Sequence, residues 1–210
     1  MLFNLCHLRA RRGYAMPDIP TGPGRMILPE LEAATSLREL LRSATRTAHD
    51  RVDALFGSCD LATEAGYTRF LTAQAAAWKT LAPVLDAPSQ ARLTGVEADL
   101  SALDVPMPAA LEDGATPPAG SLGMRYVLEG SRLGSTVLLR DLAELAPDLV
   151  DRAGAYFTAS SDLSSWKQLS TILQSHPRND VSDADVLADA TATFNLFERA
   201  FHATGALRGE

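Results

Sequence analysis

Two glycines four residues apart lie inside a stretch that otherwise has the pattern of one long helix, from about Leu122 to Leu145. Residues four apart share a helix face, so Gly130 and Gly134 leave that face without side chains over two successive turns. A flat or bulky ligand could therefore approach the backbone closely there. The alternative is close packing of a second helix, because small residues also permit that, although each glycine costs about 1 kcal/mol relative to alanine.

A histidine lies upstream, in another stretch with the apolar spacing of a helix. His49 sits beside Ala48 and Val52 at the edge of the apolar stripe. Arg42 precedes it by two helical turns on the same face. A histidine in such a place is commonly a satisfied core or boundary residue, and this reading stays open beside a functional one.

The composition limits the class of protein. With 210 residues, 46% apolar and 21% charged, the chain is long enough for one globular domain with a sizeable core. The net charge of −7 argues against a general nucleic-acid binder, and an anionic ligand would need a local basic site. The cysteines Cys6 and Cys59 form no metal-ligand pattern, which fits a reduced, cytoplasmic setting. No apolar run approaches the roughly 20 residues that span a membrane.

The apolar spacing predicts an all-α fold of about seven or eight helices in a single domain. Residues 1–34, rich in Pro, Gly and Arg, are interpreted as a mobile N-terminal extension. Residues 35–206 form the expected helical domain and 207–210 a C-terminal tail. The expected helices cover about residues 36–56, 64–86, 88–103, 122–145, 147–157, 162–173 and 182–203, with 104–120 as a long connection.

Taken together, these stretches resemble the haem oxygenase family, over about Ser36 to His202. The run LRSATRTAH that ends at His49 resembles the family's proximal helix, whose histidine ligates haem iron. The run YVLEGSRLGS from Tyr126 to Ser135 resembles its distal helix. The run FNLFE that begins at Phe194 is similar to a motif in its last helix.

The resemblance implies a haem-oxygenase-like helical bundle of the bacterial type. Haem (heme, iron protoporphyrin IX) would be both substrate and prosthetic group, with the imidazole of His49 bound to the iron. The glycines would let the distal backbone lie close over the ring. With O2 and an external electron donor, such as a ferredoxin or a reductase, the products would be biliverdin, Fe2+ and CO. A phytochrome is one conceivable recipient of biliverdin.

The resemblance also implies further site residues. Arg42 and Lys167 match cations that hold the haem propionates, and solvated surface charge is the alternative for each. Tyr126 could donate its hydroxyl to a propionate, or could be a core tyrosine. Ser131 stands where the animal enzymes carry an acidic residue; a hydroxyl can join a water network but cannot hold a charge. Ser135 is a further candidate on the distal helix.

Two other functions remain as alternatives. The first is a non-catalytic haem-binding carrier or sensor with the same fold, which Ser131 favours. The second is a helical-bundle enzyme of the thiaminase type, which would need a buried cysteine or a cluster of carboxylates. Neither a nucleic acid nor a membrane is expected as a partner.

Overall fold

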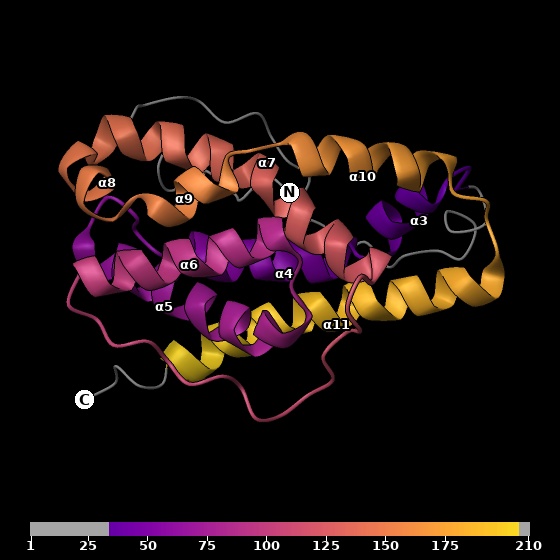
Figure 1. Ribbon diagram of the computed structural model, residues 1–210, viewed down its shortest axis with the longest axis horizontal. Coiled ribbons are helices and arrows are strands. Elements are labelled where there is room, and N and C mark those ends of the chain that lie inside the picture. The colour runs from indigo at the N-terminus through magenta and orange to yellow at the C-terminus, as the bar shows by residue number, and fades with distance from the viewer. Residues whose placement is uncertain (1–33, 206–210) are drawn as a thin grey trace.

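The computed structural model describes residues 34–205, and its arrangement can be followed in Figure 1. The described residues form helices and no strand, so the predicted all-α class is confirmed. The predicted tail at 207–210, and all of the predicted extension except residue 34, lie outside the described residues. The helices are α3 Leu37–Ala44, α4 Arg46–Gly57, α5 Glu64–Leu81, η1 Ala82–Val84, α6 Ala87–Ala102, α7 Leu122–Leu145, α8 Pro147–Ala153, α9 Ala155–Ser160, α10 Ser164–Ser175 and α11 Asp180–Gly205.

The long helix α11 is the common support of the bundle. It packs along α7 and α5, and it also contacts α4 and α3. Figure 1 shows α7 crossing the bundle obliquely, from α8 at one end toward α11 at the other. The helices α4 and α7 form no extensive interface with each other, so α11 sets the space between them.

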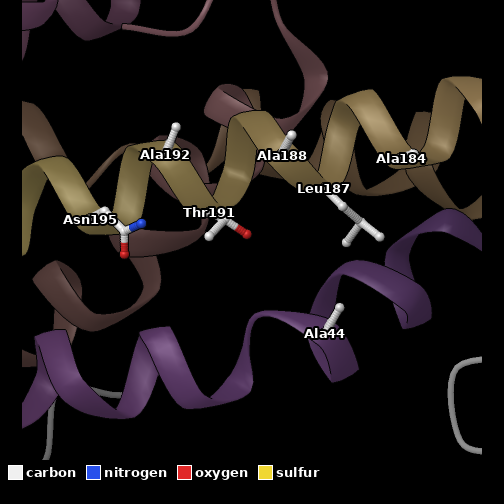
Figure 2. A pocket seen from close by; sticks show the side chains of 7 residues that line it. All are labelled: Ala44, Ala184, Leu187, Ala188, Thr191, Ala192 and Asn195. Atoms are coloured by element: carbon white, nitrogen blue, oxygen red, sulfur yellow. The ribbon is translucent and has the colours of Figure 1, made fainter. Parts of the chain in front are cut away.

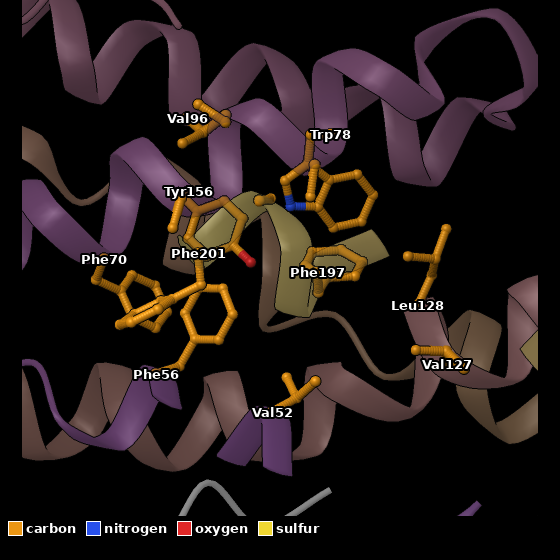
Figure 3. Packing of buried hydrophobic residues seen from close by; sticks show 14 of the residues in the cluster. Val52, Phe56, Phe70, Trp78, Val96, Val127, Leu128, Tyr156, Phe197 and Phe201 are labelled. Atoms are coloured by element: carbon orange, nitrogen blue, oxygen red, sulfur yellow. The ribbon is translucent and has the colours of Figure 1, made fainter. Parts of the chain in front are cut away.

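An aromatic cluster joins α4, α5, α9 and α11 in the core. Phe56 has its ring centroid 5.4 Å from that of Phe70 and 5.0 Å from that of Phe201. Phe70 in turn stacks on Phe157 at 5.5 Å. Figure 3 shows Phe56, Phe70 and Phe201 close together, with Trp78 and Phe197 beside them. Large rings with edge-to-face contacts stabilise a core beyond the area they bury, and here they fasten the early helices to the last one.

The prediction of a single helix over 36–56 is wrong, because the segment bends at Thr45. This residue has φ −95° and ψ 1°, and its hydroxyl donates to the carbonyl of Leu41 at 2.7 Å. A threonine hydroxyl that bonds to the preceding turn often bends a helix. The backbone bonds from Thr45 to Leu41 and from His49 to Thr45 remain, so α3 and α4 are two helices joined by a bend.

Two other predicted helices end or divide earlier than expected. α5 stops at Leu81 and gives way to the short 3-10 turn η1, because Pro83 has no N–H to continue the α-helical bonds. The stretch expected as one helix over 147–157 divides at Gly154. There the side chain of Asp99 on α6 accepts hydrogen bonds from the backbone N–H groups of Ala155 and Tyr156 at the start of α9, each at 2.8 Å.

The helix α7 approaches the backbone of α11 closely at Gly123, a glycine that the sequence patterns did not single out. A Cβ on Gly123 would lie 2.1 Å from the carbonyl oxygen of Val186 and 2.6 Å from the backbone nitrogen of Ala190. Both contacts are with backbone, which cannot move aside as a flexible side chain could. Gly123 is therefore the residue of α7 where tight helix packing demands a glycine.

We predict that Gly123→Ala destabilises the protein by about 1–3 kcal/mol, because the added methyl forces α7 and α11 apart. Gly130→Ala is the matched control on the same helix. A Cβ there would meet nothing closer than the ring of Trp166 at 3.6 Å, so the control should gain up to about 1 kcal/mol of helix propensity. Chemical denaturation of the haem-free variants measures both effects. Equal stability of the two variants would contradict the packing assignment.

Candidate functional site

His49 lies on α4 where that helix faces α11. Its neighbours Ala48 and Val52 are buried, while the His49 side chain keeps 24% of its surface exposed. The ring of Phe194, from α11, meets the imidazole edge to face, with centroids 6.0 Å apart and planes at 69°. The histidine is therefore a boundary residue whose ring orientation is partly set by α11.

Two carboxylates of α4 face the Nδ1 edge of the imidazole. The Oδ2 atom of Asp53 lies 3.4 Å from Nδ1, and the Oδ1 atom of Asp50 lies 3.6 Å from it. Asp53 is one helical turn after His49 and is 5% exposed, whereas Asp50 is largely in solvent. An Nδ1–H donated to a carboxylate leaves Nε2 with the lone pair that can bind a metal. The sequence patterns missed Asp53, although its spacing of four residues was the available signal.

Burial changes the titration of both members of this pair. Burial, with a smaller contribution from the nearby charge of Asp50, raises the pKa of Asp53 to about 7. Burial also lowers the pKa of His49, against the opposing effect of Asp50. The Oδ1 atom of Asp53 is buried and has no hydrogen-bond partner among the described residues. The imidazole is thus kept neutral, the form in which histidine acts as a metal ligand.

The glycine-bearing helix α7 packs on α11, as α4 does, and its Tyr126 reaches Thr45 at the start of α4. Gly130 and Gly134 are both buried. The nearest group to a Cβ on Gly130 would be the ring of Trp166, from α10, at an ordinary contact distance of 3.6 Å. Close helix packing therefore does not require a glycine at position 130. The ring of Trp166 closes this part of the glycine face.

Ser131 points into the interior of the bundle. Its hydroxyl accepts a hydrogen bond from Nη2 of Arg92 at 2.9 Å and donates to the carbonyl of Leu128 at 2.7 Å. Ser135 donates its hydroxyl to the carbonyl of Ser131 at 3.2 Å. Both serines thus form hydrogen bonds inside the protein, and Arg92 was not foreseen because it lies in another helix, far along the chain.

Arg92 is a buried cation, 1% exposed, and no carboxylate of residues 34–205 is hydrogen-bonded to it. It donates to the hydroxyls of Ser160 at 2.9 Å and Tyr156 at 3.2 Å, and to the carbonyl of Leu128 at 2.7 Å. Its guanidinium carbon stands 4.4 Å from the ring centroid of Trp78, a cation–π distance. Burial lowers the pKa of Arg92, yet an arginine stays charged in such a setting.

A second buried arginine lies on the same helix as the serines. Nε of Arg132 donates to the carboxylate of Glu129 at 2.6 Å, and both side chains are almost fully buried. Arg132 also donates to the carbonyls of Ala159 and Pro88. Arg132 thereby fastens α7 to α9 and to the start of α6.

The three candidates for binding propionates are placed differently. Arg42, at the end of α3, and Lys167, on α10, are both exposed. Tyr126 is half-buried on α7 and hydrogen-bonds to Thr45 at the bend before α4. Burial raises the pKa of Tyr126, while the charges of Arg38 and Arg42 act to lower it, so the structure brings Tyr126 and Arg42 near each other.

Trp166 connects the neighbourhood of Tyr126 to that of Lys167. Its ring centroid lies 6.2 Å from that of Tyr126, and the guanidinium of Arg38 stands 5.7 Å above it. Lys167 follows Trp166 directly on α10. The cation over the Trp166 ring is thus Arg38, and no hydrogen bond or ion pair joins the side chains of Arg42 and Lys167 within the described residues.

A groove of about 690 Å³ lies between α11 and the end of α3 (Figure 2). It does not contain His49 or either predicted glycine. Figure 2 shows Ala44 facing the side of α11 that carries Leu187 and Thr191, while Ala188 and Ala192 point away from it. Its lining residues are Ala44, Ala184, Leu187, Ala188, Thr191, Ala192 and Asn195.

The described residues contain neither a cluster of side chains arranged to hold a metal ion nor a helix able to span a membrane. Within 34–205 no group of three or more His, Cys, Asp and Glu side chains is arranged to hold a metal ion. No helix in that range is long and apolar enough to cross a membrane. Cys59, a possible nucleophile in the thiaminase-type alternative, is buried, and burial raises the pKa of its thiol.

We predict that Asp53→Asn stabilises the haem-free protein at pH 8 more than at pH 5. The pKa of Asp53 is near 7 when folded and near 3.8 when unfolded, so stability is lost as pH rises between these values and the carboxyl ionises in a buried place. The stabilisation should be larger at pH 8 by about 1–2 kcal/mol. Denaturant titrations at both pH values measure it, with the exposed Asp151→Asn on α8 as control. A pH-independent difference would be the contrary result.

Comparisons with known proteins point to one family. The family model described as "Heme oxygenase" matches residues 80–203, which include α7, α10 and α11 but not α4. A "Heme oxygenase" of Xanthomonas campestris pv. campestris (strain 8004) is 32% identical over 106 residues, 50% of this chain and 64% of that relative, so the match spans just under two thirds of the relative's length. The NO- and CO-bound heme oxygenase of Neisseria meningitidis shares the fold with a TM-score of 0.55 at 22% identity, covering 84% of this chain and 96% of that one. Since the family model covers more than half of the chain, the protein belongs to the haem oxygenase family.

Proposed function

We propose that the protein binds haem through His49 and cleaves it oxidatively to biliverdin, Fe2+ and CO. The observation that carries the proposal is the placement of the His49 imidazole, with Nδ1 against Asp53 and one face against Phe194. These contacts direct Nε2 as the ligating nitrogen. The family membership is independent support for the proposal. It rests on residues 80–203 and therefore does not depend on His49.

The residues present fit haem as the bound group. A neutral imidazole backed by a carboxylate at its second nitrogen is a donor set that haem iron accepts. Asp53 is close enough to hold the ring, since its Oδ2 atom lies 3.4 Å from Nδ1. His49 would therefore supply the protein's bond to iron, and Asp53 would fix the tautomer and rotation of the ring.

The glycine face of α7 would cover the opposite side of the ring. Without side chains at 130 and 134 the backbone can lie close to a flat group, and Trp166 closes the space beside Gly130. A close backbone excludes bulk water and restricts where a small second ligand can sit. Bound haem supplies the redox chemistry with O2, while the chain supplies ligation, orientation and a shaped pocket.

The propionates would lie toward α3 and α10. Arg42 and Lys167 offer positive charge there, and Tyr126 offers a hydroxyl close to Arg42. In a protein of net charge −7, such a local group of cations selects the orientation of a dianionic ligand. Both charges are exposed, so each is expected to contribute modestly.

Electrons would come from outside the chain, from a ferredoxin or a reductase, since the sequence has no nucleotide-binding signature. O2 would be the co-substrate. The reaction would take place in the cytoplasm, and a phytochrome is a conceivable recipient of the biliverdin.

A non-catalytic haem carrier or sensor is the second candidate, and Ser131 is the observation that favours it. Its hydroxyl already accepts from Arg92 and donates to Leu128, so its hydrogen is not available to a water on the glycine face. Addition of haemin followed by ascorbate or a ferredoxin system separates the two candidates. Conversion of the Soret spectrum to that of biliverdin supports the enzyme, and a stable Soret band supports the carrier.

We predict that His49→Ala removes the histidine-ligated haem spectrum and stops turnover, while the helical content by circular dichroism stays near wild type. Burial of the ring can retain some haem, so ligation is the decisive measurement. Added imidazole should restore a nitrogen-ligated spectrum, because the cavity left is about the size of the lost ring. His202→Ala, near the end of α11, is the control and should behave as wild type. A wild-type iron–histidine Raman mode in His49→Ala would rule out this ligand.

We predict that Arg42→Ala and Lys167→Ala each weaken haem binding by about 0.2–1 kcal/mol, up to roughly fivefold in Kd. The exposed positions of both side chains account for the small size. The double variant should also yield a changed mixture of biliverdin isomers, because the propionates no longer fix the ring in one rotation. Arg140→Ala, an exposed cation at the far end of α7, is the control. Unchanged Kd and isomer in the double variant would contradict the placement of the propionates.

A further inference from the structure

The FNLFE run of α11 contacts α4 at two points. Phe194, its first residue, packs its ring against the imidazole of His49. Arg51, two residues after His49, directs its Nε to the carboxylate of Glu198 at 3.1 Å and its Nη2 to Oδ1 of Asn195 at 3.4 Å. We call Phe194, Asn195, Glu198 and Arg51 the α11 clamp.

The other two residues of the run face the core. Leu196 is fully buried, and the ring of Phe197 meets Trp78 edge to face at 5.9 Å. Figure 3 shows Phe197 near the middle of the packed side chains. The run therefore has an inner part, which fixes α11 in the core, and an outer part, which holds α4. A displacement of α4 relative to α11 would break the outer contacts while the inner ones stayed in place.

The two contact points constrain rotation of α4 better than either alone. His49 and Arg51 are two residues apart, so they leave the helix in directions about 200° apart. A turn of α4 about its axis that moves one toward α11 moves the other away. Contacts from one helix to both side chains thus fix the rotation of α4, and with it the direction of the His49 ring.

A contribution to folding stability does not explain the contact between Arg51 and Glu198. Arg51 is 46% exposed and Glu198 26% exposed, and ion pairs in such positions contribute little to the free energy of folding. Their geometry is nevertheless defined, since Nε of Arg51 is within 3.3 Å of both carboxylate oxygens. A contact that is geometrically specific but weak in stability is suited to positioning.

We propose that the α11 clamp positions the axial ligand, by holding the rotation of α4 so that Nε2 of His49 points at the haem iron. The proposal rests on the proposed function, in which His49 is that ligand. Phe194, Asn195, Glu198 and Arg51 are positioning residues and do not touch the reacting atoms. The last-helix motif is then explained by what it does to the proximal helix.

The test uses Arg51→Ala, Glu198→Ala and Phe194→Leu in the full-length protein loaded with haem. Resonance Raman spectroscopy of the ferrous complexes should show the iron–histidine mode broadened and shifted to lower frequency. In the haem-free proteins, the ring protons of His49 should change chemical shift by NMR in Arg51→Ala and Glu198→Ala, because the distance to the Phe194 ring changes. Glu198→Gln keeps an acceptor oxygen for Nε of Arg51 and should restore both wild-type signals.

Arg152→Ala is the matched control. Arg152 is an exposed arginine paired with Glu64 on another helix, and neither residue is on α4 or α11. It should leave the Raman mode and the His49 shifts unchanged, while its denaturation midpoint should change about as much as that of Arg51→Ala. This comparison separates positioning from a general loss of stability.

An iron–histidine mode and His49 ring shifts that are the same as wild type in Arg51→Ala, Glu198→Ala and Phe194→Leu would overturn the clamp alone. A wild-type complex with no iron–histidine mode would overturn the proposed function, and the clamp with it. Shifts equal in size in Arg152→Ala and Arg51→Ala would also count against the clamp, since they would reflect destabilisation only.

Discussion

The packing of α11 against α4 on one side and α7 on another is the constraint on which the rest of the structure depends. Neither α4 nor α7 has an extensive interface with the other, so their relative position is inherited from α11. At Gly123 the backbone of α7 is pressed directly on that of α11, and at Phe194 a ring of α11 is pressed on His49. The helix α11 therefore sets the positions of both α4 and α7, the two helices that carry the proposed site.

The buried charges behind α7 add a second constraint. Arg92, Arg132 and Glu129 are all nearly inaccessible to water, and burying charges is costly unless hydrogen bonds replace the lost hydration. Arg92 meets this requirement with neutral oxygens and the face of Trp78 instead of a carboxylate. Because several of these oxygens belong to α7, the cation fixes that helix in one rotation as well as one position. A network of this kind favours a unique arrangement more than it favours high stability.

The sequence predicts most of the helices, because apolar periodicity is local. Short motifs are local too, so the run that ends at His49 and the run from Tyr126 to Ser135 could be related to a family from the sequence alone. His49 is visible from its own neighbours, and so are Gly130 and Gly134. The role of Arg92 could not be seen, since its partners Ser131 and Tyr156 come from helices that only the fold brings to it. The bend at Thr45 was missed for another reason: the apolar stripe continues through it, and one hydroxyl bond to Leu41 decides the geometry. Asp53 could have been found, since its spacing from His49 is that of one helical turn.

The bend at Thr45 also divides the segment into two units with different supports. α3 packs mainly on α10, and α4 packs mainly on α11. In a straight helix, a change that tilted Arg42 would tilt His49 by the same amount. With the bend, the end that carries Arg42 and the end that carries His49 have separate axes, so in the proposed haem site substitutions in α3 would reshape the propionate side without disturbing ligation by His49. In such a site, substitutions in α3 would change the contacts with the edge of a planar ligand, while the bond from His49 to the metal would stay the same. One continuous helix would not separate these two functions.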